Sequence, residues 1–65
     1  MENIKQKATT IVRDAMVNNG LLVESDVDNA YIIHNSIYPI KEYNKICSKC
    51  RKRVYDNLKL YIATY

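Results

Sequence analysis

The chain has 65 residues, of which 48% are hydrophobic and 26% are charged. This balance is typical of a folded protein, and the length allows one small domain over residues 1–65. So short a chain has little interior for a pocket that excludes water, so we do not expect an enzyme. The single Gly and single Pro disfavour an all-β fold, which needs many turns.

The first predicted helix runs from about Ile4 to Met16. Its apolar residues recur at spacings of three and four, as in a helix that buries one stripe. They are Ile4, Ala8, Ile11, Val12, Ala15 and Met16. Asn18-Asn19-Gly20 follows, and Gly20 can adopt the left-handed conformation that commonly ends a helix. We expect the helix to stop there.

The second predicted helix begins at Ser25, a favourable N-cap residue that is followed by acids in the first turn. Its apolar face continues to the end of the segment. The face contains Val27, Ala30, Tyr31, His34, Ile37 and Tyr38. Ile32 points away from this face and is expected to be exposed in a monomer, which favours a partner.

The last predicted segment is the longest periodic run of the chain. Pro39 suits the first turn of a helix. Its apolar stripe contains Ile40, Tyr43, Cys47, Cys50, Val54, Leu58, Tyr61 and Tyr65. The run is either one helix from Pro39 to about Ala63, or a short turn followed by a helix from about Ile46. The predicted fold is an all-α three-helix bundle with its last helix longest, completed by oligomerisation or by docking on a larger partner.

Cys47 and Cys50 form a Cys-x-x-Cys pair within this stripe. Free cysteine behaves as a small apolar side chain and is often buried, so the first hypothesis places both in the core. Zinc is the alternative, because two thiolates at this spacing can bind one tetrahedral ion. His34 would have to be a third ligand, or two chains would have to pool four cysteines. We expect no cofactor, with zinc as the open alternative.

A redox role for the pair is not expected. A reactive Cys-x-x-Cys normally lies at the start of a helix, with its first thiol exposed and the pKa of that thiol lowered. The basic neighbours favour such a shift, but the βαβ context of a thioredoxin-like domain is absent. No serine or glycine-rich pattern indicates another catalytic site.

Charge is distributed unevenly along the chain. Residues 1–44 hold four Lys or Arg and six Asp or Glu, a net charge of −2, whereas residues 45–65 hold six and one, a net charge of +5. The expected partner-contact residues are Lys45, Lys49, Arg51, Lys52 and Arg53. They form a solvated face, a salt-sensitive contact to nucleic acid, or a contact to an acidic protein surface.

One part of the chain resembles known proteins. The run Tyr31-Ile32-Ile33-His34-Asn35-Ser36-Ile37, with the later run from Cys47 to Lys59, is similar to short proteins of tailed phages of gut Bacteroidetes, the crAss-like group among them. The similarity covers about half of the chain and transfers no functional residue. It implies a virion component, such as an auxiliary capsid protein, or a short regulator of a host enzyme.

The leading hypothesis is a non-enzymatic interaction module that is phage-encoded and associated with the virion. Its partner would be a phage structural protein with an acidic surface, and DNA is a further candidate. The alternatives are a small nucleic-acid-binding regulator and a zinc-stabilised adapter. The N-terminal residues 1–10 lack the apolar core of a signal peptide, so the expected location is the virion or the host cytoplasm, without membrane insertion.

Overall fold

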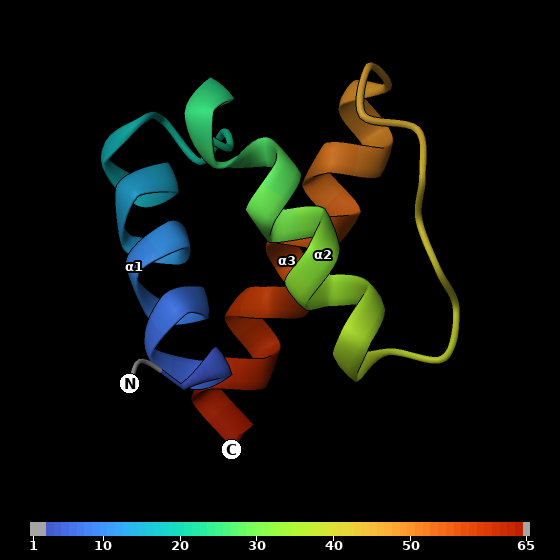
Figure 1. The fold of residues 1–65 in the computed structure, drawn as a ribbon. Coiled ribbons are helices and arrows are strands. Elements are labelled where there is room, and N and C mark those ends of the chain that lie inside the picture. Colours follow the sequence, from blue (N-terminus) through green and yellow to red (C-terminus); the bar gives the residue numbers. More distant parts are fainter. Residues whose placement is uncertain (1–2, 65) are drawn as a thin grey trace.

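The computed structural model describes residues 3–64. Over this range the chain forms three α-helices, α1 (Ile4–Val17), α2 (Val27–Ile37) and α3 (Ser48–Thr64), and the 3₁₀ turn η1 (Glu24–Asp26) directly before α2. No strand occurs among these residues. Helix α3 packs against both α1 and α2 and ends near the start of α1 (Figure 1). The predicted all-α three-helix bundle, with its last helix longest, is confirmed.

Helix α1 is capped at both ends, and the stop at its C-terminal end is the one that the sequence predicts. The side chain of Asn3 accepts the backbone N–H of Gln6 at 2.7 Å, and the side chain of Gln6 accepts the N–H of Asn3 at 3.3 Å. This reciprocal pair satisfies two N–H groups that have no partner within the helix. At the other end Asn19 and Gly20 have φ values of 60° and 77°, and the Gly20 N–H donates to Ala15 O at 2.8 Å. The predicted stop is confirmed.

The N-cap of α2 lies one residue later than predicted. Ser25 is not its N-cap but lies inside η1, where the Asp26 N–H donates to Val23 O at 2.8 Å. The side chain of Asp26, the residue before α2, makes no capping hydrogen bond. The tighter 3₁₀ turn therefore takes the place of the predicted side-chain cap.

The prediction that Pro39 opens a helix is wrong. The residue before it, Tyr38, has an extended backbone (φ −114°, ψ 140°), as expected of a residue that precedes proline, and α2 ends there. Residues 38–47 form a loop, and α3 starts at Ser48. Of the two alternatives, a turn followed by a separate helix is therefore the one observed. Tyr65, the last member of the predicted stripe, lies outside the described residues.

The core lies where the three helices meet. The buried apolar residues are Ala8, Ile11, Val12, Ala15, Leu22, Val27, Ala30, Tyr31, Ile33, Val54, Tyr55 and Leu58. Most of them belong to the predicted stripes, and Ile32 is 65% exposed as expected. Within residues 3–64 no helix combines the length and the apolar character that crossing a membrane requires.

Candidate functional site

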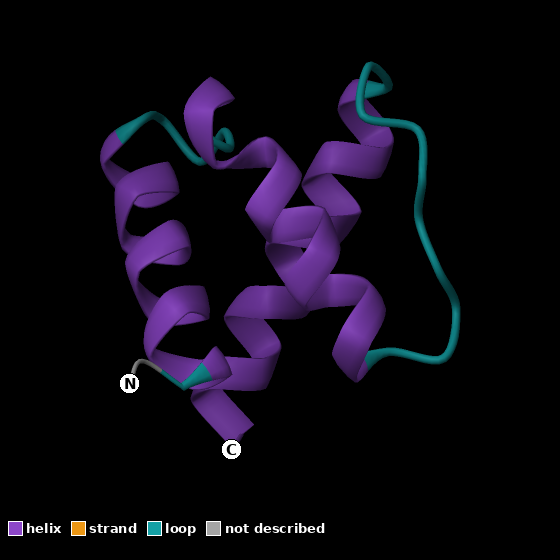
Figure 2. Cartoon of the chain, in the orientation of Figure 1, coloured by secondary structure: helices purple, strands orange, loops and turns teal. Residues whose placement is uncertain are grey.

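The 38–47 loop joins α2 to α3 and runs along one side of the molecule (Figure 2). It has no helical turn of its own, so its shape depends on contacts with the helices. The side chain of Asn35 on α2 holds the middle of the loop. Its Nδ2 donates to Glu42 O at 2.8 Å, and its Oδ1 accepts the Glu42 N–H at 2.9 Å. One amide side chain thus satisfies both backbone groups of a loop residue.

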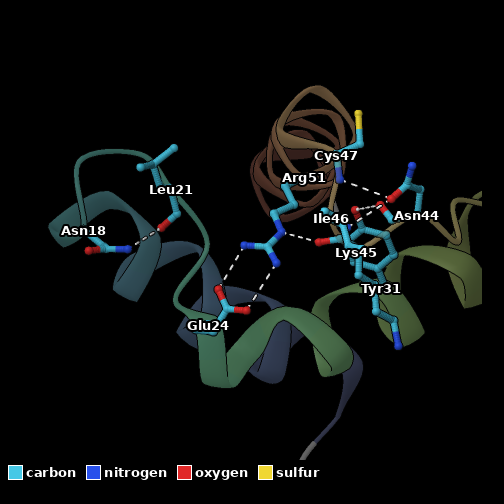
Figure 3. Close-up of polar contacts among 9 residues, drawn as sticks. All are labelled: Asn18, Leu21, Glu24, Tyr31, Asn44, Lys45, Ile46, Cys47 and Arg51. Atoms are coloured by element: carbon cyan, nitrogen blue, oxygen red, sulfur yellow. Dashed lines mark hydrogen bonds and ion pairs between the residues drawn. The ribbon is translucent and has the colours of Figure 1, made fainter.

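The end of the loop is held by Tyr31 and Asn44. The buried Tyr31 donates its hydroxyl to Asn44 O at 2.7 Å. Burial raises the pKa of this hydroxyl, so the hydroxyl stays protonated and can donate this hydrogen bond. Asn44 in turn accepts the N–H groups of Ile46 and Cys47 through its Oδ1, at 3.0 and 3.2 Å. A short chain of polar contacts therefore leads from the core of α2 to the start of α3 (Figure 3).

Among residues 3–64, three ion pairs connect the acidic first part of the chain with its basic last part. Arg51 on α3 binds both carboxylate oxygens of Glu24, at 3.0 and 3.2 Å, and its Nε donates to Lys45 O (Figure 3). The other two pairs are Lys45 with Asp28 at 2.9 Å and Arg53 with Glu42. Three of the five expected partner-contact residues are thus engaged within the chain.

Lys49 and Lys52 are the other two expected partner-contact residues. Both are exposed, and within residues 3–64 neither side chain forms an ion pair or a hydrogen bond. Lys45 and Arg53 are also exposed, as predicted, although each has an acidic partner. The positive charge that remains available on this side of the molecule is therefore smaller than the sequence indicates.

Large apolar side chains in the loop face solvent. Ile40, Tyr43 and Ile46 are 77%, 76% and 91% exposed. Ile40 and Tyr43 were expected to continue the buried stripe of the last helix, and that expectation is wrong because the helix starts only at Ser48. A scattered exposed apolar residue is ordinary, but here three lie in one loop whose backbone is held by polar contacts. We call Ile40, Tyr43 and Ile46 the loop apolar set.

Cys47 and Cys50 lie at the start of α3. Cys47 immediately precedes the helix, and its carbonyl accepts the N–H of Arg51 at 3.0 Å. Its Sγ accepts the N–H of Cys50 at 3.4 Å. Both cysteines are free thiols and half-buried, so the hypothesis that they are core residues is wrong. Cys47 lies before the helix, and Cys50 lies in its first turn, in register with the buried Val54 and Leu58 but only half-buried itself.

The two thiols have different acidities. A hydrogen bond from the Cys50 thiol lowers the pKa of Cys47, and the N–H groups of Cys50 and Lys49 and the charge of Arg53 add to this effect. The same thiol–thiol hydrogen bond, together with desolvation, raises the pKa of Cys50. Cys47 is therefore the thiol that ionises first.

His34 is a buried, hydrogen-bonded residue of α2. Its Nδ1 lies 3.0 Å from Asn35 Oδ1 and its Nε2 lies 2.9 Å from Asn57 Nδ2, and its ring stacks on that of Tyr38. Because the amide of Asn57 donates to Nε2, Nδ1 carries the proton. Binding of zinc by His34 would break at least one of these bonds. Within residues 3–64 no three His, Cys, Asp or Glu side chains are grouped to hold a metal ion.

Comparison with protein-family models, curated proteins and solved structures finds no match for this chain. Sequence periodicity missed the loop because Ile40 and Tyr43 fall by chance in register with the stripe of α3. Pro39 was the signal in the sequence for this loop, because a helical conformation is disfavoured for the residue before a proline.

Proposed function

We propose that this chain is a non-enzymatic interaction module that docks on the acidic surface of another protein through its 38–47 loop. The observation that carries the proposal is the loop apolar set, which faces solvent on a backbone held by Asn35, Tyr31 and Asn44. A preorganised loop loses little conformational entropy when it binds. Apolar and tyrosine contacts of this kind form the centre of many protein interfaces.

Charge favours an acidic partner. Lys49 and Lys52 are unpaired cations close in sequence to Ile46, and Lys41 lies between Ile40 and Tyr43. Cations around an apolar centre provide the polar rim typical of an interface and select a partner of opposite charge. An interface of standard size covers about 800 Å² on each side, roughly one sixth of the 4638 Å² accessible surface of this chain.

The resemblance to short phage proteins suggests where such a surface occurs. We infer that the partner is a phage structural protein and that the chain is a minor component of the virion. The ion pairs support a protein partner over nucleic acid, because Arg51 and Arg53 already bind carboxylates of the same chain. Lys49 and Lys52 alone would neutralise about two phosphates, which gives weak binding at physiological salt.

The test is a quantitative pull-down with three baits: the native chain, an Ile40→Ser/Tyr43→Ser/Ile46→Ser variant, and a Val17→Ser/Leu60→Ser control. The control changes residues that are 85% and 60% exposed but lie outside the loop. We expect the native chain and the control to retain the same acidic proteins and the loop variant to lose them. Circular dichroism should show the same helix content in all three.

Two results would contradict the proposal. If the loop variant retains every association, the loop is not the docking surface. If nuclease treatment removes what the native chain retains, the partner is nucleic acid. The virion assignment is tested separately by mass spectrometry of purified particles, and absence of the chain from them would overturn that assignment alone.

A further inference from the structure

The thiol pair at the start of α3 has an arrangement that neither the bundle nor the docking loop requires. Cys47 lies at the cap position, and its Sγ accepts the N–H of Cys50 in the first turn. The two cysteines are three residues apart across this first turn, and the hydrogen bond from the Cys50 N–H holds the Cys47 sulfur next to the backbone of Cys50. Both side chains are partly open to solvent.

We propose that Cys47 and Cys50 form a thiol–disulfide exchange site whose substrates are small disulfides of the glutathione type. The inference does not depend on the proposed docking function, because it requires only the first turn of α3. Redox chemistry was not expected from the sequence, since the βαβ context was missing. The structure provides the two local conditions without that context, namely a helix start and a partly exposed first thiol.

The two cysteines have different roles. The Cys47 thiolate is the attacking group, because the N–H groups of Cys50 and Lys49 stabilise its negative charge. Cys50, whose pKa is raised, stays protonated until a mixed disulfide has formed on Cys47. Once Cys47 is in the mixed disulfide, the thiol–thiol hydrogen bond that raised the pKa of Cys50 no longer exists.

The exchange has two steps. The Cys47 thiolate attacks one sulfur of the small disulfide, a Cys47–sulfur bond forms, and the first small thiolate leaves and takes up a proton. Cys50 then loses its proton to solvent and attacks Cys47 Sγ, which forms the Cys47–Cys50 disulfide and releases the second small thiolate. In total, two protein thiols are oxidised and one small disulfide is reduced to two thiols.

The test equilibrates the full chain with mixtures of reduced and oxidised glutathione, followed by acid quenching, alkylation of free thiols and intact-mass measurement. We expect a single transition to a monomer that has lost two hydrogen atoms, with little glutathione adduct. The transition should not depend on protein concentration, because the disulfide forms within one chain. Covalent dimers or a stable glutathione adduct as the main product would overturn the proposal.

Two single variants assign the roles. Cys50→Ala introduces a good helix former in the first turn of α3, and this variant should accumulate the Cys47–glutathione adduct. Cys47→Ser introduces a favourable cap residue and should form its adduct on Cys50 more slowly, because the backbone N–H groups that stabilise the Cys47 thiolate make no such bonds to Cys50. Equal rates in the two variants would contradict the assigned roles.

A measurement in concentrated urea provides the control for the folded structure. The two variants should react at similar rates there, because the helix start that stabilises the Cys47 thiolate is lost. A rate difference that persists unchanged in urea would show that neighbouring residues, and not the fold, cause it. That result would overturn the structural basis of the proposal. It does not require that either variant folds well in buffer, because the urea measurement is made on the unfolded chain.

Discussion

Asn35 binds both backbone groups of Glu42, with its Nδ2 at 2.8 Å from the carbonyl oxygen and its Oδ1 at 2.9 Å from the amide nitrogen. Through this pair α2 holds a loop that has no secondary structure of its own. The Glu42 side chain in turn binds Arg53 on α3. The loop is therefore fixed to two helices at one residue, which explains how its apolar side chains can face solvent while its backbone stays in place.

Replacing Asn35 by Ala should free the loop without melting the bundle. Both hydrogen bonds to Glu42 are lost, at a cost of about 1–3 kcal/mol in the free energy of unfolding. Hydrogen exchange should show that the Glu42 amide loses its protection, whereas the protection of Leu58 falls only by the amount that the lost free energy of unfolding predicts. Asn29→Ala, an exposed change on the same helix, is the matched control. Full protection of Glu42 in the Asn35 variant would contradict this account of the loop.

Leu58→Ala should remove much of the stability of the domain. Leu58 is fully buried where α3 meets the other helices, and such truncations cost about 2–5 kcal/mol. In a 65-residue domain this loss is a large part of the total. Leu60→Ala on the same helix is the control, because Leu60 is 60% exposed and should change stability little. Urea unfolding followed by circular dichroism measures both, and equal effects would contradict the assigned packing of α3.

The hydroxyl of Tyr31 should make stability depend on alkaline pH. Its pKa is raised in the folded state, so its contribution is fully present below the unfolded pKa of about 10 and is lost as pH rises through the folded value. Tyr31→Phe lacks the hydrogen bond to Asn44 and should cost about 1 kcal/mol at neutral pH. The difference in the free energy of unfolding between the native chain and the Tyr31→Phe variant should narrow above about pH 10. A difference that stays constant with pH would contradict the raised pKa.

Alkylation by iodoacetamide should detect the lowered pKa of Cys47. The rate at Cys47 should reach half of its maximum at a lower pH than in the urea-unfolded chain, because the thiolate is the reactive form. Cys50→Ala should raise this midpoint, since it removes the largest cause of the shift. Cys50→Ser should raise it less, because a hydroxyl can still donate to Cys47. Peptide mass spectrometry measures the rates, and identical midpoints in the folded and unfolded chains would rule out the shift.

The paired and unpaired cations should respond differently to replacement. Arg51→Gln removes the two bonds to Glu24 and should lower the Tm at low ionic strength, with a smaller effect at about 1 M salt. Lys49→Gln with Lys52→Gln should leave the Tm unchanged at both salt concentrations, because neither lysine has an acidic partner among residues 3–64. Equal Tm changes in the two variants would show that Arg51 and Glu24 do not stabilise the fold.

The local features of this fold could be predicted from the sequence. The stripe of Ala8, Ile11, Val12 and Ala15 and the stop at Gly20 depend on spacing and on backbone preference, and both act over a few residues. The same holds for the buried face of α2 and for the exposure of Ile32. Neighbouring residues are sufficient to determine features of this kind.

Contacts between residues distant in sequence decided the rest. The same spacing of apolar residues runs through Ile40, Tyr43, Cys47 and Cys50, but Asn35 and Tyr31 hold this segment as a loop, and α3 begins only at Ser48. The net charges of −2 and +5 in the two parts of the chain suggested a negative partner for the cations. Three of those cations instead bind acids of the same chain, because folding brings residues 11 to 27 positions apart within reach of an ion pair.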